Sequence, residues 1–264
     1  PNVAVTVALD LSGSTHEGQP FNAPGTIMAQ SVEAVKAYLQ ANATLKTPNH
    51  FKIIGMGGGK APELTQEFQA DPQAVEAELM KAMRDPKLPQ SIQPQPPRDN
   101  LNVVFEKATQ AFNAVPNMCR ELVVISDAGV DLSDSAVSEA VANNIRVSSI
   151  VFGSDNVPAL QQAATQTKGL YLSGGSADFV QFFTDKFFPK FNSNLRWIIF
   201  WIGATWIALM WTLTLPLDIF FQKVMRYPMH FAGKLALGNA LFWSAATPGI
   251  IWRIAEGLPF IAKC

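Results

Sequence analysis

A run of 21 residues without a charge is the feature that most constrains this chain. Residues 197–217 read WIIFWIGATWIALMWTLTLPL, and about 20 apolar residues are what an α-helix needs to cross the hydrocarbon core of a bilayer. Arg196 precedes the run and Asp218 follows it, and tryptophans near both ends suit the two membrane interfaces. We therefore expect a transmembrane helix over about residues 197–217.

A second apolar run covers residues 235–252 and is interrupted by Gly238, Asn239 and the pair Pro248 and Gly249. This run has two interpretations. It crosses as the return leg of a hairpin, or it lies in the membrane interface as an irregular segment held against partner helices, which satisfy backbone groups that proline frees. We expect it to cross, so that the chain ends in a transmembrane hairpin.

The chain therefore has two unlike parts, a head of residues 1–191 and a membrane anchor of residues 192–264, which we call the tail. From residue 195 onward, six Lys and Arg stand against two acids, a net charge of +4, and the whole chain carries -1, which leaves -5 for the head. An acidic head lacks the basic surface that neutralises nucleic-acid phosphates, so we expect no nucleic-acid partner. All the tryptophans lie in the tail: Trp197, Trp201, Trp206, Trp211, Trp243 and Trp252.

The orientation of the head follows from two weaker signals. The chain opens as PNVAVTVALD, with no basic segment or apolar leader ahead of the first strand-like run, which favours a cytoplasmic head in a multi-pass membrane protein. The count of Lys and Arg near the membrane ends agrees with this orientation. It places Lys186, Lys190, Arg196, Arg253 and Lys263 inside and Lys223, Arg226 and Lys234 outside.

The head alternates strand-like and helix-like segments, which is typical of an α/β, doubly wound, mostly parallel sheet with helices on both faces. The expected strands are residues 3–9, 51–56, 121–126, 146–152 and 169–172. The expected helices are residues 27–39, 73–83, 101–112, 136–143, 159–165 and 177–191. In such a sheet, ligands bind beside the carboxyl ends of the strands.

Two oxygen-rich segments follow expected strands at that edge. Asp10, Ser12 and Ser14 follow the first strand, and Asp127 follows the strand ELVVIS. Alternate side chains of a tight turn face one side, so the carboxylate and the two hydroxyls can converge. Oxygen ligands of this kind, with waters in the remaining positions, suit Mg²⁺ or Mn²⁺.

This pattern resembles the von Willebrand factor type A family, and the resemblance covers about residues 1–190. It implies a Rossmann-like fold and a metal-ion-dependent adhesion site, built from an Asp-x-Ser-x-Ser loop, a threonine that opens a later helix, and an aspartate after the fourth strand. The sequence departs from the family in the middle part, where Asp99 stands in place of the usual threonine. It also has Ala128 where a glycine is customary, with Gly129 following.

Asp99 has two interpretations. As a ligand it joins Asp10 and Asp127, and three carboxylates leave a divalent site at -1, which strengthens metal binding but makes the metal a poorer receptor for a partner's carboxylate. As a helix cap it accepts hydrogen bonds from the first turn of the following helix. The two roles can coexist. The expected ligand set is Asp10, Ser12, Ser14, Asp99 and Asp127, around Mg²⁺ or alternatively Mn²⁺ or Ca²⁺.

Two further segments lie beside this edge. The glycines before Lys60 lack the residues of a phosphate-binding Walker loop and predict a flexible turn. The proline-rich residues 86–97 predict an extended, stiff loop, which is either a partner contact or a surface insertion. An aspartyl nucleophile at Asp10 is disfavoured, because Ser12 occupies the position where such enzymes usually carry a second acid.

We therefore expect a membrane-anchored binding module that is not an enzyme and holds another protein through a metal-centred edge of the head. The alternative is a metal-independent structural subunit of a larger membrane assembly, favoured by small tail residues that allow close helix contact. Those residues are Gly233, Gly238, Ala240 and Ser244. A metal-dependent phosphatase or hydrolase that uses Asp10 is a third reading. The expected partners are a protein within a membrane complex and the lipid bilayer.

Overall fold

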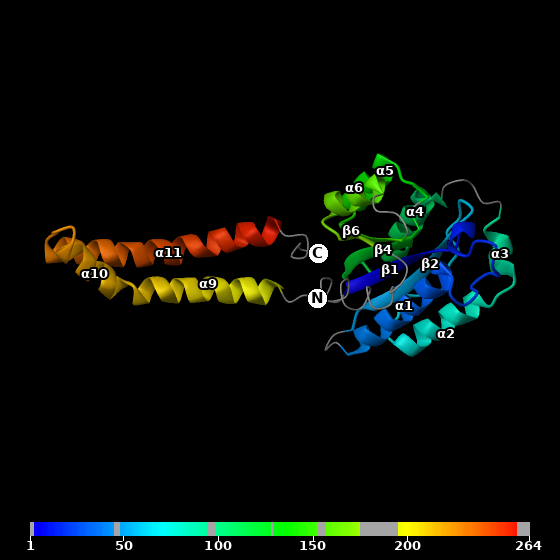
Figure 1. Ribbon diagram of the computed structural model, residues 1–264, viewed down its shortest axis with the longest axis horizontal. Helices are drawn as coiled ribbons and strands as arrows, with labels where there is room; N and C mark the ends of the chain where they lie inside the picture. The colour runs from blue at the N-terminus through cyan, green and yellow to red at the C-terminus, as the bar shows by residue number, and fades with distance from the viewer. Residues whose placement is uncertain are drawn as a thin grey trace. The chain divides into compact units, whose positions relative to one another are not determined.

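A computed structural model describes residues 3–44, 48–93, 99–127, 129–152, 157–174 and 195–257 (Figure 1). The chain divides into two compact units, Pro1–Asn192 and Ser193–Lys263. We call them the head unit and the tail unit. The expected helix over residues 177–191 lies outside the described residues.

The head unit is built on a parallel sheet of five strands in the order β2-β1-β4-β6-β7. Every neighbouring pair in that order is parallel, which confirms the expected α/β fold. The three central strands are buried on both faces, as expected for nearly continuous apolar runs. The strands are β1 (Val3–Asp10), β2 (His50–Met56), β4 (Cys119–Ser126), β6 (Ile145–Phe152) and β7 (Tyr171–Gly174).

Helices cover both faces of the sheet (Figure 1). One face carries α1 (Ile27–Ala43) and α2 (Pro72–Met83), and the other carries α4 (Leu101–Phe112), α5 (Asp134–Ala142) and α6 (Pro158–Thr167). Alternate strand residues supply the two faces: Ala4 and Ala8 belong to the core under α4 to α6. Phe51 instead packs edge-on against Tyr38 of α1, with ring centroids 5.0 Å apart.

Short elements lie near the edge of the sheet where the strands end. They are η1 (Gly13–Thr15), α3 (Lys87–Ser91) and a parallel pair of two-residue strands, β3 (Asp99–Asn100) and β5 (Val130–Asp131).

The expectation of an extended chain from Pro86 onward is wrong for α3. The Asp85 carboxylate accepts the Lys87 backbone N–H at 2.9 Å, Leu88 is buried, and prolines in a first turn lack only donors that a helix leaves unpaired there. Residues 94–98 of this segment lie outside the described residues.

The tail unit consists of α9 (Leu195–Thr212), α10 (Thr214–Lys223) and α11 (Met229–Gly257). The expected single helix over residues 197–217 is instead two helices that meet at Leu213 with a bend of 40°. Pro216 has no N–H to donate to the preceding turn, and the Thr214 hydroxyl donates to the Trp211 carbonyl at 2.7 Å. Both features bend helices.

Within the described residues, no single helix is long and apolar enough to cross a membrane. The bent pair Ile198–Thr212 and Thr214–Lys223 meets that criterion when taken together. The second run, expected over residues 235–252, lies in α11, which has 29 residues and contains Pro248 without ending there.

Small residues let the helices of the tail unit pack closely. Ala232, Ala236 and Ala240 are buried along one side of α11. A Cβ atom added at Gly203 would lie 1.8 Å from the Ile251 side chain, whereas one added at Gly238 would meet nothing within 4 Å. The small-residue contact expected from the sequence is therefore used inside the hairpin at Ala240, and Gly238 takes no part in it.

Candidate functional site

The loop after β1 presents Asp10 at the carboxyl edge of the sheet. The side chain of Leu11 is completely buried, and the Leu11 N–H donates to the Met56 carbonyl at 2.8 Å, which fixes the loop to β2. Asp10 is 3% exposed, and its Oδ1 atom accepts the Ser12 N–H at 2.9 Å. Leu11 therefore belongs to the core, whereas the polar residues on either side of it, Asp10 and Ser12, belong to the edge of the sheet.

The two serine hydroxyls of this loop lie side by side, Ser12 at the N-cap of η1 and Ser14 within it. Ser12 Oγ and Ser14 Oγ are 2.9 Å apart, a distance at which either hydroxyl can donate to the other. Neighbouring ligands of an octahedral Mg²⁺ with bonds of 2.0–2.1 Å are also about 2.9 Å apart. The Thr15 hydroxyl donates to the Ser12 carbonyl at 2.7 Å and holds the turn closed. The serines therefore fit two adjacent positions of a magnesium site.

Ser126 is a residue of this edge that the sequence analysis missed. Its hydroxyl donates to Asp10 Oδ2 at 2.9 Å, so the end of β4 orients the carboxylate at the end of β1. A carboxylate oxygen has two lone pairs, so it can accept a hydrogen bond and also bind a cation. The sequence did offer one signal for Ser126, because this serine ends the strand ELVVIS directly before Asp127.

Asp127 and Asp99 reach the same edge from different elements. Asp127 follows β4 directly and is half-buried. Asp99 opens β3 and is paired in register with Val130 of β5, three residues after Asp127. The structure thus brings the backbone of the Asp99 segment beside the loop that follows Asp127, while the side chain of Asp99 lies outside what is described.

A hydrogen-bond network fixes that junction. The Asn100 side chain caps α4 by accepting the Asn102 N–H at 3.0 Å. The Asn102 Oδ1 atom accepts the Ser133 N–H at 2.9 Å and the Ser133 hydroxyl at 2.7 Å. Asn100 therefore performs the capping that we considered for Asp99, and this leaves the ligand role of Asp99 as a hypothesis.

Among the described residues, no three His, Cys, Asp or Glu side chains gather into a group that could hold a metal ion. A site here would depend on hydroxyl as well as carboxylate oxygens, which is the donor chemistry of Mg²⁺ with retained waters. The buried Asp10 carboxylate and the paired serine hydroxyls fit such an ion. We call this edge, made of Asp10, Ser12, Ser14, Ser126 and Asp127, the oxygen rim.

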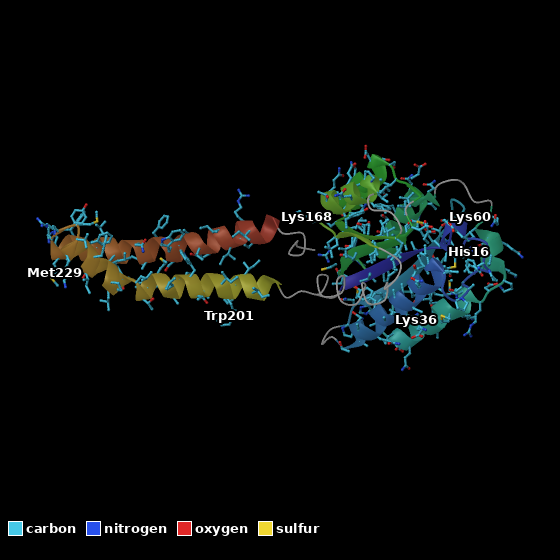
Figure 2. All side chains as sticks on the ribbon, in the orientation of Figure 1. His16, Lys36, Lys60, Lys168, Trp201 and Met229 are labelled. Atoms are coloured by element: carbon cyan, nitrogen blue, oxygen red, sulfur yellow. The ribbon has the colours of Figure 1, made fainter. Side chains whose placement is uncertain are left out.

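The glycine turn expected beside the oxygen rim is present, closed by a bridge between Gly57 and Lys60. Gly58 has a φ of 60°, and a Cβ atom there would lie 1.9 Å from the Ile92 carbonyl oxygen. The Lys60 ammonium donates to the Ser91 carbonyl at 2.7 Å, so the turn is held against the end of α3. Figure 2 shows Lys60 and His16 at this end of the head unit, where the adjacent strands β1 and β2 finish.

A second buried carboxylate, Glu121, lies at the opposite end of β4 from Asp127 and outside the oxygen rim. Arg146 Nε donates to Glu121 Oε2, and the Ser148 hydroxyl donates to Oε1 at 2.6 Å. Burial raises the pKa of Glu121, although the charge of Arg146 and the hydrogen bonds from Ser148 and Arg146 oppose that rise. This group braces β4 against β6 and is not a rim ligand.

No protein-family model matches the sequence, and no curated protein matches it. Solved structures do match the head. The SpRpn10 VWA domain is 14% identical with a TM-score of 0.55, and the match covers 70% of this chain and 95% of that one. The head unit has the von Willebrand factor type A fold.

Two more solved structures share this fold with the head. An aerotolerance-related membrane protein from Bacteroides fragilis is 14% identical with a TM-score of 0.52, over 70% of this chain and 96% of that one. Proximal thread matrix protein 1 from the mussel byssus, with a zinc-occupied MIDAS motif, is 11% identical with a TM-score of 0.50, over 69% and 46%. At these identities the likeness establishes the fold of the head.

Proposed function

We propose that this protein is a membrane-anchored interaction module, in which the oxygen rim holds a divalent cation and binds another protein. The observation that carries the proposal is a group of oxygen atoms at the carboxyl edge of a parallel sheet. The Asp10 carboxylate accepts the Ser12 N–H, and the Oγ atoms of Ser12 and Ser14 are 2.9 Å apart. Mg²⁺ bound there would supply a positive centre for an oxygen ligand of the partner. The zinc-occupied motif of the byssus protein supports a divalent ion in this fold.

Asp10 and the serines have distinct tasks in this proposal. Asp10 is held by Ser12 N–H and Ser126 Oγ and supplies negative charge at a fixed place. Ser12 and Ser14 supply neutral oxygens. Asp127 and Asp99 complete the set as we propose it, and their charges make the bound metal a weaker receptor for a partner's carboxylate than a site with threonine at position 99.

The membrane anchorage rests on the exposed surface of the tail unit. Trp201, Ile202 and Phe242 are each more than 60% exposed, and α11 with 29 residues is about 43 Å long. A surface of this kind is costly in water and matches a hydrocarbon surrounding. We propose that the tail lies in a bilayer as a hairpin, with the head on the cytoplasmic side.

The first experiment is the purification of the intact protein in mild detergent, in parallel with Mg²⁺ and with EDTA, and identification of the proteins that remain bound. We expect partners to leave with the metal and to be lost in the double variant Ser12→Ala/Ser14→Ala. The control is Ser138→Ala/Thr165→Ala, which removes two exposed hydroxyls of α5 and α6 that do not belong to the rim. Partners that stay in EDTA and in the serine variant would refute the metal-dependent function.

The second experiment measures metal binding without a partner. Calorimetric titration of Mg²⁺ should show binding to the wild type, weaker binding to Asp99→Thr, and none to Asp10→Asn. Equal affinity of the wild type and Asp99→Thr would remove Asp99 from the ligand set, while leaving the other rim residues in place.

A metal-independent structural subunit is the second candidate function. The observation that favours it is the extent of exposed apolar surface on the tail unit, which can hold other membrane helices whatever the rim binds. Partners that survive both EDTA and the serine variant, but dissociate when the tail is altered, would establish it.

Hydrolase chemistry at Asp10 is the least supported reading. A nucleophile has to reach its substrate, whereas Asp10 is almost fully buried and both of its oxygens accept hydrogen bonds. Metal-dependent turnover that disappears in Asp10→Asn would revive this reading.

A further inference from the structure

We propose that the turn between α10 and α11 binds the phosphates of anionic lipid headgroups. This inference rests on the proposed membrane anchorage. We call residues 223–234 the basic turn, because Lys223, Arg226 and Lys234 are all exposed there. The sequence has no Asp or Glu between Asp218 and Glu256, so the compensating negative charge does not come from within this stretch.

One acid, Asp218, precedes the basic turn in the sequence. Asp218 accepts a hydrogen bond from the Gln222 side chain at 2.9 Å through Oδ2. Its Oδ1 atom is buried and faces Gly233 of α11, where an added Cβ would lie 3.8 Å away. Its carboxylate is therefore directed between the helices.

The backbone of the basic turn is fixed. The Tyr227 N–H donates to the Phe221 carbonyl at 3.0 Å, and the Tyr227 ring lies between those of Phe221 and Phe231, with centroids 6.5 and 5.3 Å away. Arg226 has a φ of 56°, in the left-handed region. A fixed backbone lowers the ordering cost when charged side chains engage a ligand.

Apolar side chains beside the cations identify a lipid as the source of the phosphate. Met229, labelled at the end of the hairpin in Figure 2, is 77% exposed, and Val224 is 65% exposed. A free phosphate ion would leave these side chains in water, whereas a glycerolipid covers them with its chains and presents its phosphate at the same level. Tyr227 also suits a membrane interface.

Electrostatic attraction sets the size of the expected effect. A Lys or Arg near an anionic membrane surface contributes about 1 kcal/mol, which is about a fivefold change in binding for each cation. The attraction acts over a Debye length of about 10 Å at 0.1 M salt and about 3 Å at 1 M. Preference for anionic lipid should therefore fall in high salt.

The test uses the full chain in nanodiscs made of phosphatidylcholine with phosphatidylglycerol, extracted into mild detergent, with the retained lipids identified by mass spectrometry. We expect the wild type to retain phosphatidylglycerol in excess of its share. The triple variant K223Q/R226Q/K234Q should lose that excess at least fivefold. The matched control K81Q/R84Q/K87Q removes the same number of Lys and Arg from exposed head positions and should retain it.

Insertion is measured separately in nanodiscs of phosphatidylcholine alone. Failure of the wild type to insert there would refute the membrane anchorage itself. Normal insertion with equal retention of the two lipids, or with equal retention by the wild type and the triple variant, would overturn only the headgroup site. Loss of the excess when inorganic phosphate is added at constant ionic strength would show that the turn binds free phosphate, which also overturns the lipid assignment.

Discussion

The head unit buries its large hydrophobic side chains, whereas the tail unit exposes most of its own. Val141 is the exposed large hydrophobic residue of the described head, whereas exposed Trp, Phe, Ile and Leu side chains cover α9, α10 and α11. Conversely, the residues buried inside the hairpin are mostly small, such as Ala232 and Ala240. The head therefore derives its stability from apolar burial, and the tail packs through small residues with its apolar bulk outside.

This difference separates the functional tasks as well. Two buried carboxylates of the head, Asp10 on β1 and Glu121 on β4, are held by hydrogen bonds. Three of the six Lys and Arg residues of the tail lie in the basic turn between α10 and α11. We interpret the head as a unit that folds in water and presents the oxygen rim, and the tail as a unit that matches a bilayer.

The same substitution placed in both units should have unequal costs. Phe112 is fully buried and stacks on Phe68 with centroids 5.6 Å apart, so Phe112→Ala should lower the free energy of unfolding of the head by about 3–5 kcal/mol. Phe242→Ala, at a site that is 63% exposed, should change the tail little. Denaturant titration in detergent, followed by far-UV circular dichroism and by tryptophan fluorescence, separates the units because every tryptophan is in the tail. Similar costs at both positions would contradict the comparison.

A lysine on the two exposed surfaces should distinguish their surroundings. Phe242 lies near the middle of α11, so Phe242→Lys should weaken stable insertion into vesicles by about 2.5–3.5 kcal/mol, the cost of a charge at the centre of a spanning helix. Val141→Lys, at the exposed position of the head, should leave insertion unchanged. Flotation of vesicles after carbonate extraction measures the inserted fraction. Equal insertion of both variants would indicate that the α11 surface does not face hydrocarbon.

Two glycines of the tail should respond differently to added bulk. Gly203→Leu places a side chain against Ile251, and overpacking of this kind costs about 1–3 kcal/mol. Gly238→Leu enters open space and gains helix propensity, so the hairpin should keep or increase its stability. Loss of tryptophan fluorescence anisotropy on heating reports the hairpin. A larger cost at Gly238 would show that an additional contact covers that face.

The smallest expected effect is a pH dependence within the head. Burial raises the folded-state pKa of Glu121 above its ordinary value of 4.5, so its contribution to stability is fully present below 4.5 and is lost as the pH rises through the raised pKa. In Glu121→Gln the unfolding free energy should no longer show this decrease with rising pH. Unfolding midpoints of both proteins over that pH range provide the measurement, and parallel curves would contradict the assignment.

Glu63 is the counterpart with the opposite sign. Burial favours a higher pKa there, but the Lys107 hydrogen bond and the charges of Lys52 and Lys107 outweigh it and hold the pKa below 4.5. Its contribution is present above 4.5 and is lost as the pH falls through the lowered pKa. Glu63→Gln should therefore remove a component that rises with pH, in contrast to Glu121→Gln.

The fold of the head could be predicted because its signals are periodic and local. The strand and helix segments alternate, and the α4 bounds, Leu101–Phe112, agree with the expected residues 101–112. The loop after β1 also carries its chemistry in consecutive residues. By contrast, α3 depends on Asp85 accepting the Lys87 N–H, and the prolines in that segment concealed it.

The rest of the site depends on contacts between distant residues. Ser126 meets Asp10 across 116 positions, and Gly58 owes its role to the close approach of Ile92. Neither contact has a local pattern. In the tail, the apolar run predicted a single helix, but hydrogen bonding by Thr214 and the missing N–H of Pro216 divide it at Leu213.

Tryptophan quenching in reconstituted vesicles tests the contrast between the two units most directly, because all six tryptophans belong to the tail. Figure 2 marks Trp201, which is 61% exposed on α9. We predict strong quenching by lipids brominated on their acyl chains and weak quenching by aqueous iodide. Strong quenching by iodide with none by brominated lipid would place the tail surface in water and contradict the account.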